Sequence, residues 1–208
     1  MPALDGGDVE QASKLARRNV QQMLPYVRKG YRVLAVNPTC SMMMRKEYPK
    51  LLDSDEAQEL ADAVMDPNEY LDQLRRDGRL DTNFRSTPGK IAYHVPCHLR
   101  AQNIGYRSRD MMRAIGGETK IELVTECCGH DGTWAMKTEY FELSLQSGQK
   151  AFAAMTADDE ALMVTDCPLA AIQFEQATGK APLHPLQVLA RAYEPDGFPT
   201  QVVKDGDG

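Results

Sequence analysis

The sequence has no long apolar run, no basic leader and no excess of positive charge. No stretch approaches the roughly 18 apolar residues that a membrane-spanning helix needs. The first residues, Met-Pro-Ala-Leu-Asp-Gly-Gly-Asp, lack the basic and apolar regions of a secretory signal. With 24 basic and 30 acidic residues, the formal net charge of −6 argues against binding to nucleic acid or directly to an anionic membrane. These absences predict a globular protein of the cytoplasm.

The cysteines are few and lack the spacing of the common small metal and redox motifs. There are five, an odd number, and no two of them form a Cys-x-x-Cys pair. The odd count and the missing signal peptide disfavour a disulfide framework. The missing Cys-x-x-Cys disfavours a zinc knuckle and a thioredoxin-like pair. We therefore expect the thiols to be free, catalytic or bound to a metal.

The apolar pattern predicts an α/β protein built from parallel-sheet βα units. Short apolar runs that are typical of buried strands lie at 31–36, 90–94, 121–125 and 161–165. Stretches with helical spacing lie at 8–28, 53–77, 106–115, 138–156, 168–177 and 185–192. Strands separated by helices imply crossover connections and parallel pairing.

Every cysteine lies shortly after a predicted strand. The five are Cys40, Cys97, Cys127, Cys128 and Cys167. The carboxyl ends of parallel strands meet at one edge of a sheet, where open α/β sheets bind ligands. Helix N-termini at that edge favour negative charge, and an iron–sulfur cluster held by thiolates is usually anionic. Two adjacent thiolates joined by two more from distant strands therefore favour a polynuclear iron–sulfur site.

Other interpretations stay open at this point. Cysteine also packs as a small hydrophobe, so the set could be structural, and zinc is a second metal to consider. A single activated thiol beside His98 or His130 could be a nucleophile. Either histidine is more commonly a satisfied loop residue than a base or a ligand.

The chain resembles itself around two of the cysteines. Val-Leu-Ala-Val-Asn-Pro-Thr-Cys, ending at Cys40, matches Ala-Leu-Met-Val-Thr-Asp-Cys-Pro around Cys167. Each is a predicted strand, a turn, a cysteine and a helix. The expected organisation is the C-terminal half of a first unit at 1–49, a helical linker at 50–89, a complete unit at 90–192 and a polar tail at 193–208.

These motifs resemble a known family, the cysteine-rich domain with the CCG signature. That domain occurs in the B subunit of heterodisulfide reductase, in glycolate and lactate oxidation iron–sulfur proteins and in the C subunit of anaerobic glycerol-3-phosphate dehydrogenase. The resemblance covers about residues 1–192. The motifs that carry it are Pro96-Cys97-His98, Cys127-Cys128-Gly129, Cys167, Tyr93-His94-Val95, Asn37-Pro38-Thr39-Cys40 and Met44-Arg45-Lys46-Glu47-Tyr48-Pro49.

The resemblance implies an iron–sulfur electron-transfer subunit, or a fragment of one, in a larger oxidoreductase complex. It implies that a [4Fe–4S] cluster, cubane or non-cubane, is bound by Cys97, Cys127, Cys128 and Cys167. Cys40 would be a metal ligand of the first unit. The implied partners are flavin-dehydrogenase or other iron–sulfur subunits, and the implied acceptor is a quinone or another carrier. The implied location is the cytoplasm, with peripheral attachment to the inner membrane through those partners.

Two alternatives accompany that function. One is a thiol–disulfide reductase that uses the cluster on a bound disulfide, as heterodisulfide reductase does. The other is a structural remnant without activity, either metal-free or bound to zinc.

The sequence departs from the family pattern in three respects. The unit often ends in Cys-x-x-Cys, but Ala170 and Met43 stand at the second position of the two copies. Cys40 lacks the companions of its unit, and the family's N-terminal ferredoxin-like domain is absent. We therefore expect an N-terminally truncated chain, for which the missing N-terminal half is a further partner.

Overall fold

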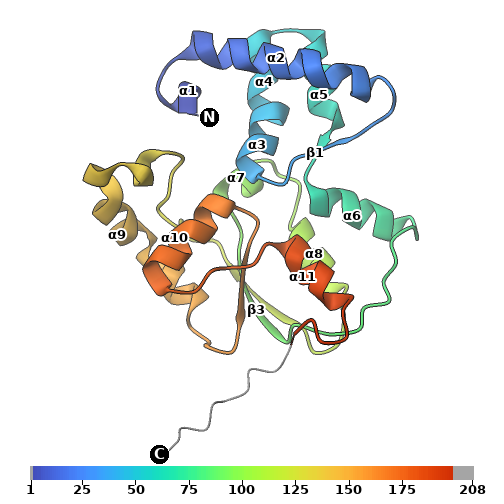
Figure 1. Ribbon diagram of the computed structural model, residues 1–208, viewed down its shortest axis with the longest axis vertical. Coiled ribbons are helices and arrows are strands. Elements are labelled where there is room, and N and C mark those ends of the chain that lie inside the picture. Colours follow the sequence, from blue (N-terminus) through green and yellow to red (C-terminus); the bar gives the residue numbers. More distant parts are fainter. Residues whose placement is uncertain (1, 199–208) are drawn as a thin grey trace, which may run out of the picture.

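The computed structural model describes residues 2–198 and shows helices combined with parallel strands (Figure 1). The predicted α/β class is confirmed. None of the helices in this range is both long and apolar enough to cross a membrane. The predicted polar tail lies outside the described residues from 199 onward.

The larger sheet has three parallel strands in the order β4–β3–β5. The strands are β3 (Lys90–His94), β4 (Lys120–Val124) and β5 (Leu162–Thr165). His94 lies opposite Val124 on one side and Thr165 on the other, so all three strands end at the same level. The sequence predicts each strand to within one residue. β3 and β5 are largely buried and read as short apolar runs, whereas β4 is an edge strand in which exposed residues alternate with more buried ones.

Helices cover both faces of this sheet. On one face lie α8 (Arg107–Arg113) and α11 (Pro185–Ala192), and on the other lie α9 (Thr138–Met155) and α10 (Pro168–Thr178). Successive side chains of a strand point to opposite faces. Ile91 and Tyr93 therefore join Met112 in one core, while Ala92 joins Phe174 in the other.

The N-terminal half is mostly helical and lies at one end of the molecule (Figure 1). Its elements are α1 (Pro2–Asp5), α2 (Val9–Val27), β1 (Val33–Leu34), α3 (Pro38–Met42), the π-helical turn η1 (Met43–Glu47), α4 (Tyr48–Leu52), α5 (Asp55–Ala63), β2 (Val64–Met65) and α6 (Pro67–Arg76). β1 pairs in parallel with β2. Ala16, Val20 and Leu24 of α2 pack with Leu60 of α5 in the core of this half.

The structure differs from the sequence-based expectation in three short elements. The strand predicted at 31–36 has only two paired residues, because within the described chain β2 is its sole neighbour. β2 and the one-turn helix α7 (Cys97–Arg100) are too short to show a periodicity. The stretch 50–89, expected to be a linker, also supplies β2 to the first sheet. The domain boundaries and the partial copy at 1–49 stay predictions.

Candidate metal centre

The three parallel strands deliver four cysteines to one edge of the larger sheet. Cys97 follows β3 and begins α7, while Cys127 and Cys128 follow β4. Cys167 follows β5 and is the N-cap of α10, with Pro168 at the first helical position. The strands end in register, so the four thiols come together although they are up to 70 residues apart in sequence.

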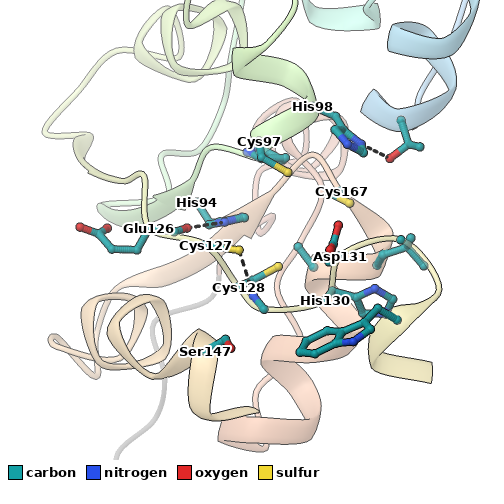
Figure 2. A pocket seen from close by; sticks show the side chains of 17 residues that line it. His94, Cys97, His98, Glu126, Cys127, Cys128, His130, Asp131, Ser147 and Cys167 are labelled. Atoms are coloured by element: carbon teal, nitrogen blue, oxygen red, sulfur yellow. Dashed lines mark hydrogen bonds between the residues drawn. The ribbon is translucent and has the colours of Figure 1, made fainter. Parts of the chain in front are cut away.

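These four cysteines line a single cavity of about 330 Å³. Figure 2 shows their sulfur atoms around the same space. Trp134, in the segment that follows Cys128, also lines the cavity. Leu169 and Ala170 of α10 complete a largely apolar lining. The predicted set is therefore brought together by the fold, at a site that is partly shielded from water.

The Cys-Cys-Gly turn is held tightly against α9. Gly129 has a φ of +79°, which L side chains rarely adopt, and a Cβ there would collide with the backbone oxygen of Ser144. The backbone N–H of Gly129 donates a hydrogen bond to the sulfur of Cys127 over 3.3 Å. Glycine is required because the turn must approach the helix backbone closely.

The protein environment disfavours thiolates at this site unless a cation is present. Burial, with smaller contributions from the neighbouring cysteines, raises the pKa of Cys128 to about 12. Burial, followed by the charge of other cysteines, also raises the pKa values of Cys97 and Cys167. An activated cysteine nucleophile needs a lowered pKa, so these three thiols do not fit that alternative.

The donor set fits iron–sulfur chemistry. Within residues 2–198, no group of three or more His, Cys, Asp or Glu side chains is arranged to hold a single metal ion. A mononuclear zinc site is therefore not formed by these side chains as they lie. A polynuclear cluster distributes its ligands over several iron atoms, so four thiols around one cavity are the appropriate soft donors.

The three histidines at the cavity differ in their surroundings. His94, which the sequence analysis named only as part of the Tyr93-His94-Val95 motif, contacts Thr165 Oγ1 through Nδ1 (3.0 Å) and the carbonyl oxygen of Glu126 through Nε2 (3.2 Å). Burial lowers the pKa of His94 to about 4, so the ring is neutral. Its two contacts link the ends of β3, β4 and β5. Only the alternation of β3 could have indicated that this residue points inward.

His98 and His130 lie on loops or short turns beside the cysteines. His98 Nδ1 is 2.8 Å from the hydroxyl of Thr39, so it is satisfied, as expected of a loop histidine. His130 is buried, its pKa is lowered by burial, and its Nδ1 has no protein partner within the described residues.

Cys40 does not reach the cavity. It lies exposed on α3, which packs against α7, and its neighbour Thr39 is the residue that lines the site. Gln102 fixes this contact by donating to Ser41 Oγ over 2.8 Å. A role for Cys40 as a metal ligand of the first unit stays a prediction.

The comparisons with known proteins cover the region that contains the four cysteines. Residues 91–175 match the family model of the CCG cysteine-rich domain. The chain is 30% identical over 193 residues to the C subunit of anaerobic glycerol-3-phosphate dehydrogenase from two strains of Escherichia coli, which covers 92% of this chain and 48% of the relative. It is 27% identical over 146 residues to lactate utilization protein A of Geobacillus thermodenitrificans, which covers 65% of this chain and 57% of that protein.

The chain spans about half the length of the curated relatives it matches. No solved structure matches it significantly.

Proposed function

Because residues 91–175 belong to the family of CCG cysteine-rich domains, we propose that the chain is an iron–sulfur electron-transfer subunit of an oxidoreductase, or part of one. The observation that carries this proposal is the convergence of four thiols from three strand ends on one apolar cavity. One of the curated relatives is named as a dehydrogenase subunit, which supports the same conclusion.

The residues of the cavity have separate roles in this proposal. Cys97, Cys127, Cys128 and Cys167 would hold the cluster. A bound iron–sulfur cluster would supply one-electron transfer. The N–H of Gly129 stabilises negative charge on the sulfur of Cys127.

The walls of the cavity control its contact with solvent. Trp134, Leu169 and Ala170 form apolar parts of the wall, whereas Cys97 and Cys127 are exposed to solvent. Thr39 and His98 join the N-terminal half to the rim of the cavity.

The finer part of the proposal concerns the path of the electrons. The chain would receive them from a flavin-dehydrogenase or another iron–sulfur subunit and pass them to a quinone or another acceptor. It would work in the cytoplasm, attached to the inner membrane only through its partners. The name of the Escherichia coli relative, a subunit of a dehydrogenase, supports the expectation of subunit partners.

The experiment is anaerobic reconstitution of the purified chain with iron and sulfide. We expect about four iron and four sulfide per chain, as four thiolates suit a [4Fe–4S] cluster, and a broad absorption near 400 nm that bleaches on reduction. Background iron together with stoichiometric zinc would overturn the proposal.

A further inference from the structure

The imidazole ring of His94 contacts the segments that lead to three separate cysteines. His94 is the last residue of β3, three residues before Cys97, and it is 2% exposed and lines the cavity. Its Nε2 lies 3.2 Å from the carbonyl oxygen of Glu126, the residue directly before Cys127. Its Nδ1 lies 3.0 Å from Oγ1 of Thr165, the last residue of β5. One side chain therefore connects all three strand ends that carry the thiols.

These two contacts determine which ring nitrogen of His94 carries the proton. A carbonyl oxygen can only accept a hydrogen bond, so Nε2 must be the donor to Glu126. A neutral imidazole has a single N–H, so Nδ1 is an acceptor. The hydroxyl of Thr165 must then donate its proton to Nδ1.

The same threonine side chain also holds Cys167. Because the hydroxyl proton of Thr165 is directed at His94, its oxygen is left to accept a hydrogen bond. The backbone N–H of Cys167 donates to this oxygen over 3.4 Å. Thr165 is 2% exposed, so burial limits competition from water for both bonds. The hydrogen bonds therefore run in one direction, from Cys167 through Thr165 and His94 to the carbonyl group of Glu126, and each polarises the next.

The ends of β3 and β5 are also joined on the opposite face of the sheet. Successive residues of a strand point to opposite faces, and Tyr93 and Asp166 are the neighbours of His94 and Thr165 in the sequence. Tyr93 donates to Asp166 Oδ2 over 2.5 Å, and Ser108 donates to Oδ1. The two residues directly before Cys167 are thus fixed from both faces. The link to β4 comes from the His94 ring.

The ring of His94 is not itself suited to bind iron. The proton on Nε2 is used by Glu126 and the lone pair on Nδ1 by Thr165, so both nitrogens are already occupied. A T-shaped contact with Phe174, at 5.0 Å between ring centroids, restrains the orientation of the ring further. His94 can therefore act on a metal centre only through the cysteines whose segments it holds.

We propose that His94 is the positioning residue of the cysteine centre. Held as the Nε2–H tautomer, it presets the spacing of Cys97, Cys127 and Cys167 before a cluster binds. This inference rests on the proposed function. Ligands that are fixed in advance by a second set of hydrogen bonds do not have to be ordered when the metal arrives, and removal of such partners typically costs 10–100-fold in metal affinity.

The test is a pair of substitutions at Thr165, in the middle of the hydrogen-bonded chain. Thr165→Val keeps the branched shape of the side chain but has no hydroxyl, so it leaves both His94 Nδ1 and the N–H of Cys167 without this partner. Thr165→Ser keeps the hydroxyl. After anaerobic reconstitution, we expect a chelator to remove iron from Thr165→Val about tenfold faster or more, and from Thr165→Ser at nearly the rate of the unmodified protein.

The electron paramagnetic resonance spectrum of the reduced protein separates positioning from a loss of stability. Thr165→Val should change the g values, because the sulfur ligands move, and Thr165→Ser should restore them. The matched control is Thr178→Val, which removes a hydroxyl that donates to the carbonyl oxygen of Phe174 (2.7 Å) near the end of α10. It should leave the iron loss and the spectrum unchanged. Iron loss and g values in Thr165→Val that equal those of Thr165→Ser would overturn the inference.

A further measurement does not depend on any variant. In the metal-free protein labelled with ¹⁵N-histidine, nuclear magnetic resonance should show a one-bond N–H coupling at Nε2 of His94 and none at Nδ1. The opposite tautomer would overturn the inference and leave the proposed function standing. Unmodified protein that takes up no iron overturns the proposed function, and the inference falls with it.

Discussion

Replacement of Gly129 by alanine tests whether the Cys-Cys-Gly turn depends on close backbone contact. The positive φ alone costs a side-chain residue about 1–2 kcal/mol. The new Cβ would also meet the backbone oxygen of Ser144 and, at 3.0 Å, the backbone nitrogen of Gly148. Neither obstacle is the end of a flexible side chain, so the turn or α9 must shift, and overpacking of this kind costs about 1–3 kcal/mol. We expect a total destabilisation of about 2–5 kcal/mol.

Gly179 provides the matched control. It ends α10 with a similar φ of +71°, but a Cβ there meets nothing within 4 Å. Gly179→Ala should therefore lower the free energy of unfolding by only about 1–2 kcal/mol.

Urea unfolding of the metal-free protein measures both variants, and reconstitution measures their iron content. Gly129→Ala should also lose iron, because its shift moves Cys127 and Cys128, whereas Gly179→Ala should retain it. Equal stability of the two variants, or full iron content in Gly129→Ala, would refute the argument that close packing positions the two sulfurs.

Four further predictions concern the cysteines, Asp66 and the open edge of β1. Serine at Cys97, Cys127, Cys128 or Cys167 should remove most of the cluster absorbance, whereas Cys40→Ser should retain it because Cys40 lies outside the cavity. In metal-free protein, burial raises the pKa of Cys128 to about 12, so mass spectrometry should find it alkylated slowly at pH 8 and faster as the pH rises. The pKa of Asp66 is about 4 in the unfolded chain and about 7 in the folded protein, so ionisation of Asp66 lowers the free energy of unfolding as the pH rises from about 4 to about 7. Asp66→Asn should therefore be more stable than the unmodified protein above about pH 7, as measured by urea unfolding. Leu34 lies on β1, which has β2 as its one partner strand within residues 2–198, and Val36 is exposed two residues beyond it, so gel filtration should show concentration-dependent self-association that Val36→Lys reduces.

The convergence of the four cysteines could be predicted because each strand and the cysteine that follows it are close together in the sequence. Each strand of the larger sheet is a short apolar run, and each is followed within a few residues by cysteine. Parallel pairing then brings the strand ends together without further knowledge of the fold. The same logic predicts that Cys40 follows a strand, and it does follow β1. That strand belongs to the other sheet, so the thiol lies outside the cavity.

The different surroundings of Asp66 and Asp72 could not be predicted from the sequence in the same way. Asp66 and Asp72 are six residues apart, both acidic, and both in a stretch whose pattern is that of a polar helix. Asp72 pairs with Arg75 and Arg76 on its own helix and with Arg107 of α8, whereas no ion pair reaches Asp66 within the described chain, so only part of their difference is tertiary. Long-range charge pairing leaves no periodic signal along the chain.

Asp72 and Asp66 differ in how their surroundings affect the ionisation of the carboxyl group. Arginine contacts lower the pKa of Asp72, so this carboxyl group stays ionised and its charge is already neutralised by its neighbours. Asp66 is buried without arginine partners, so burial and the charge of Asp166 raise its pKa. A group of the first kind contributes to the fold at all neutral pH values. A group of the second kind changes its charge near neutral pH, because burial is the largest cause that raises its pKa to about 7.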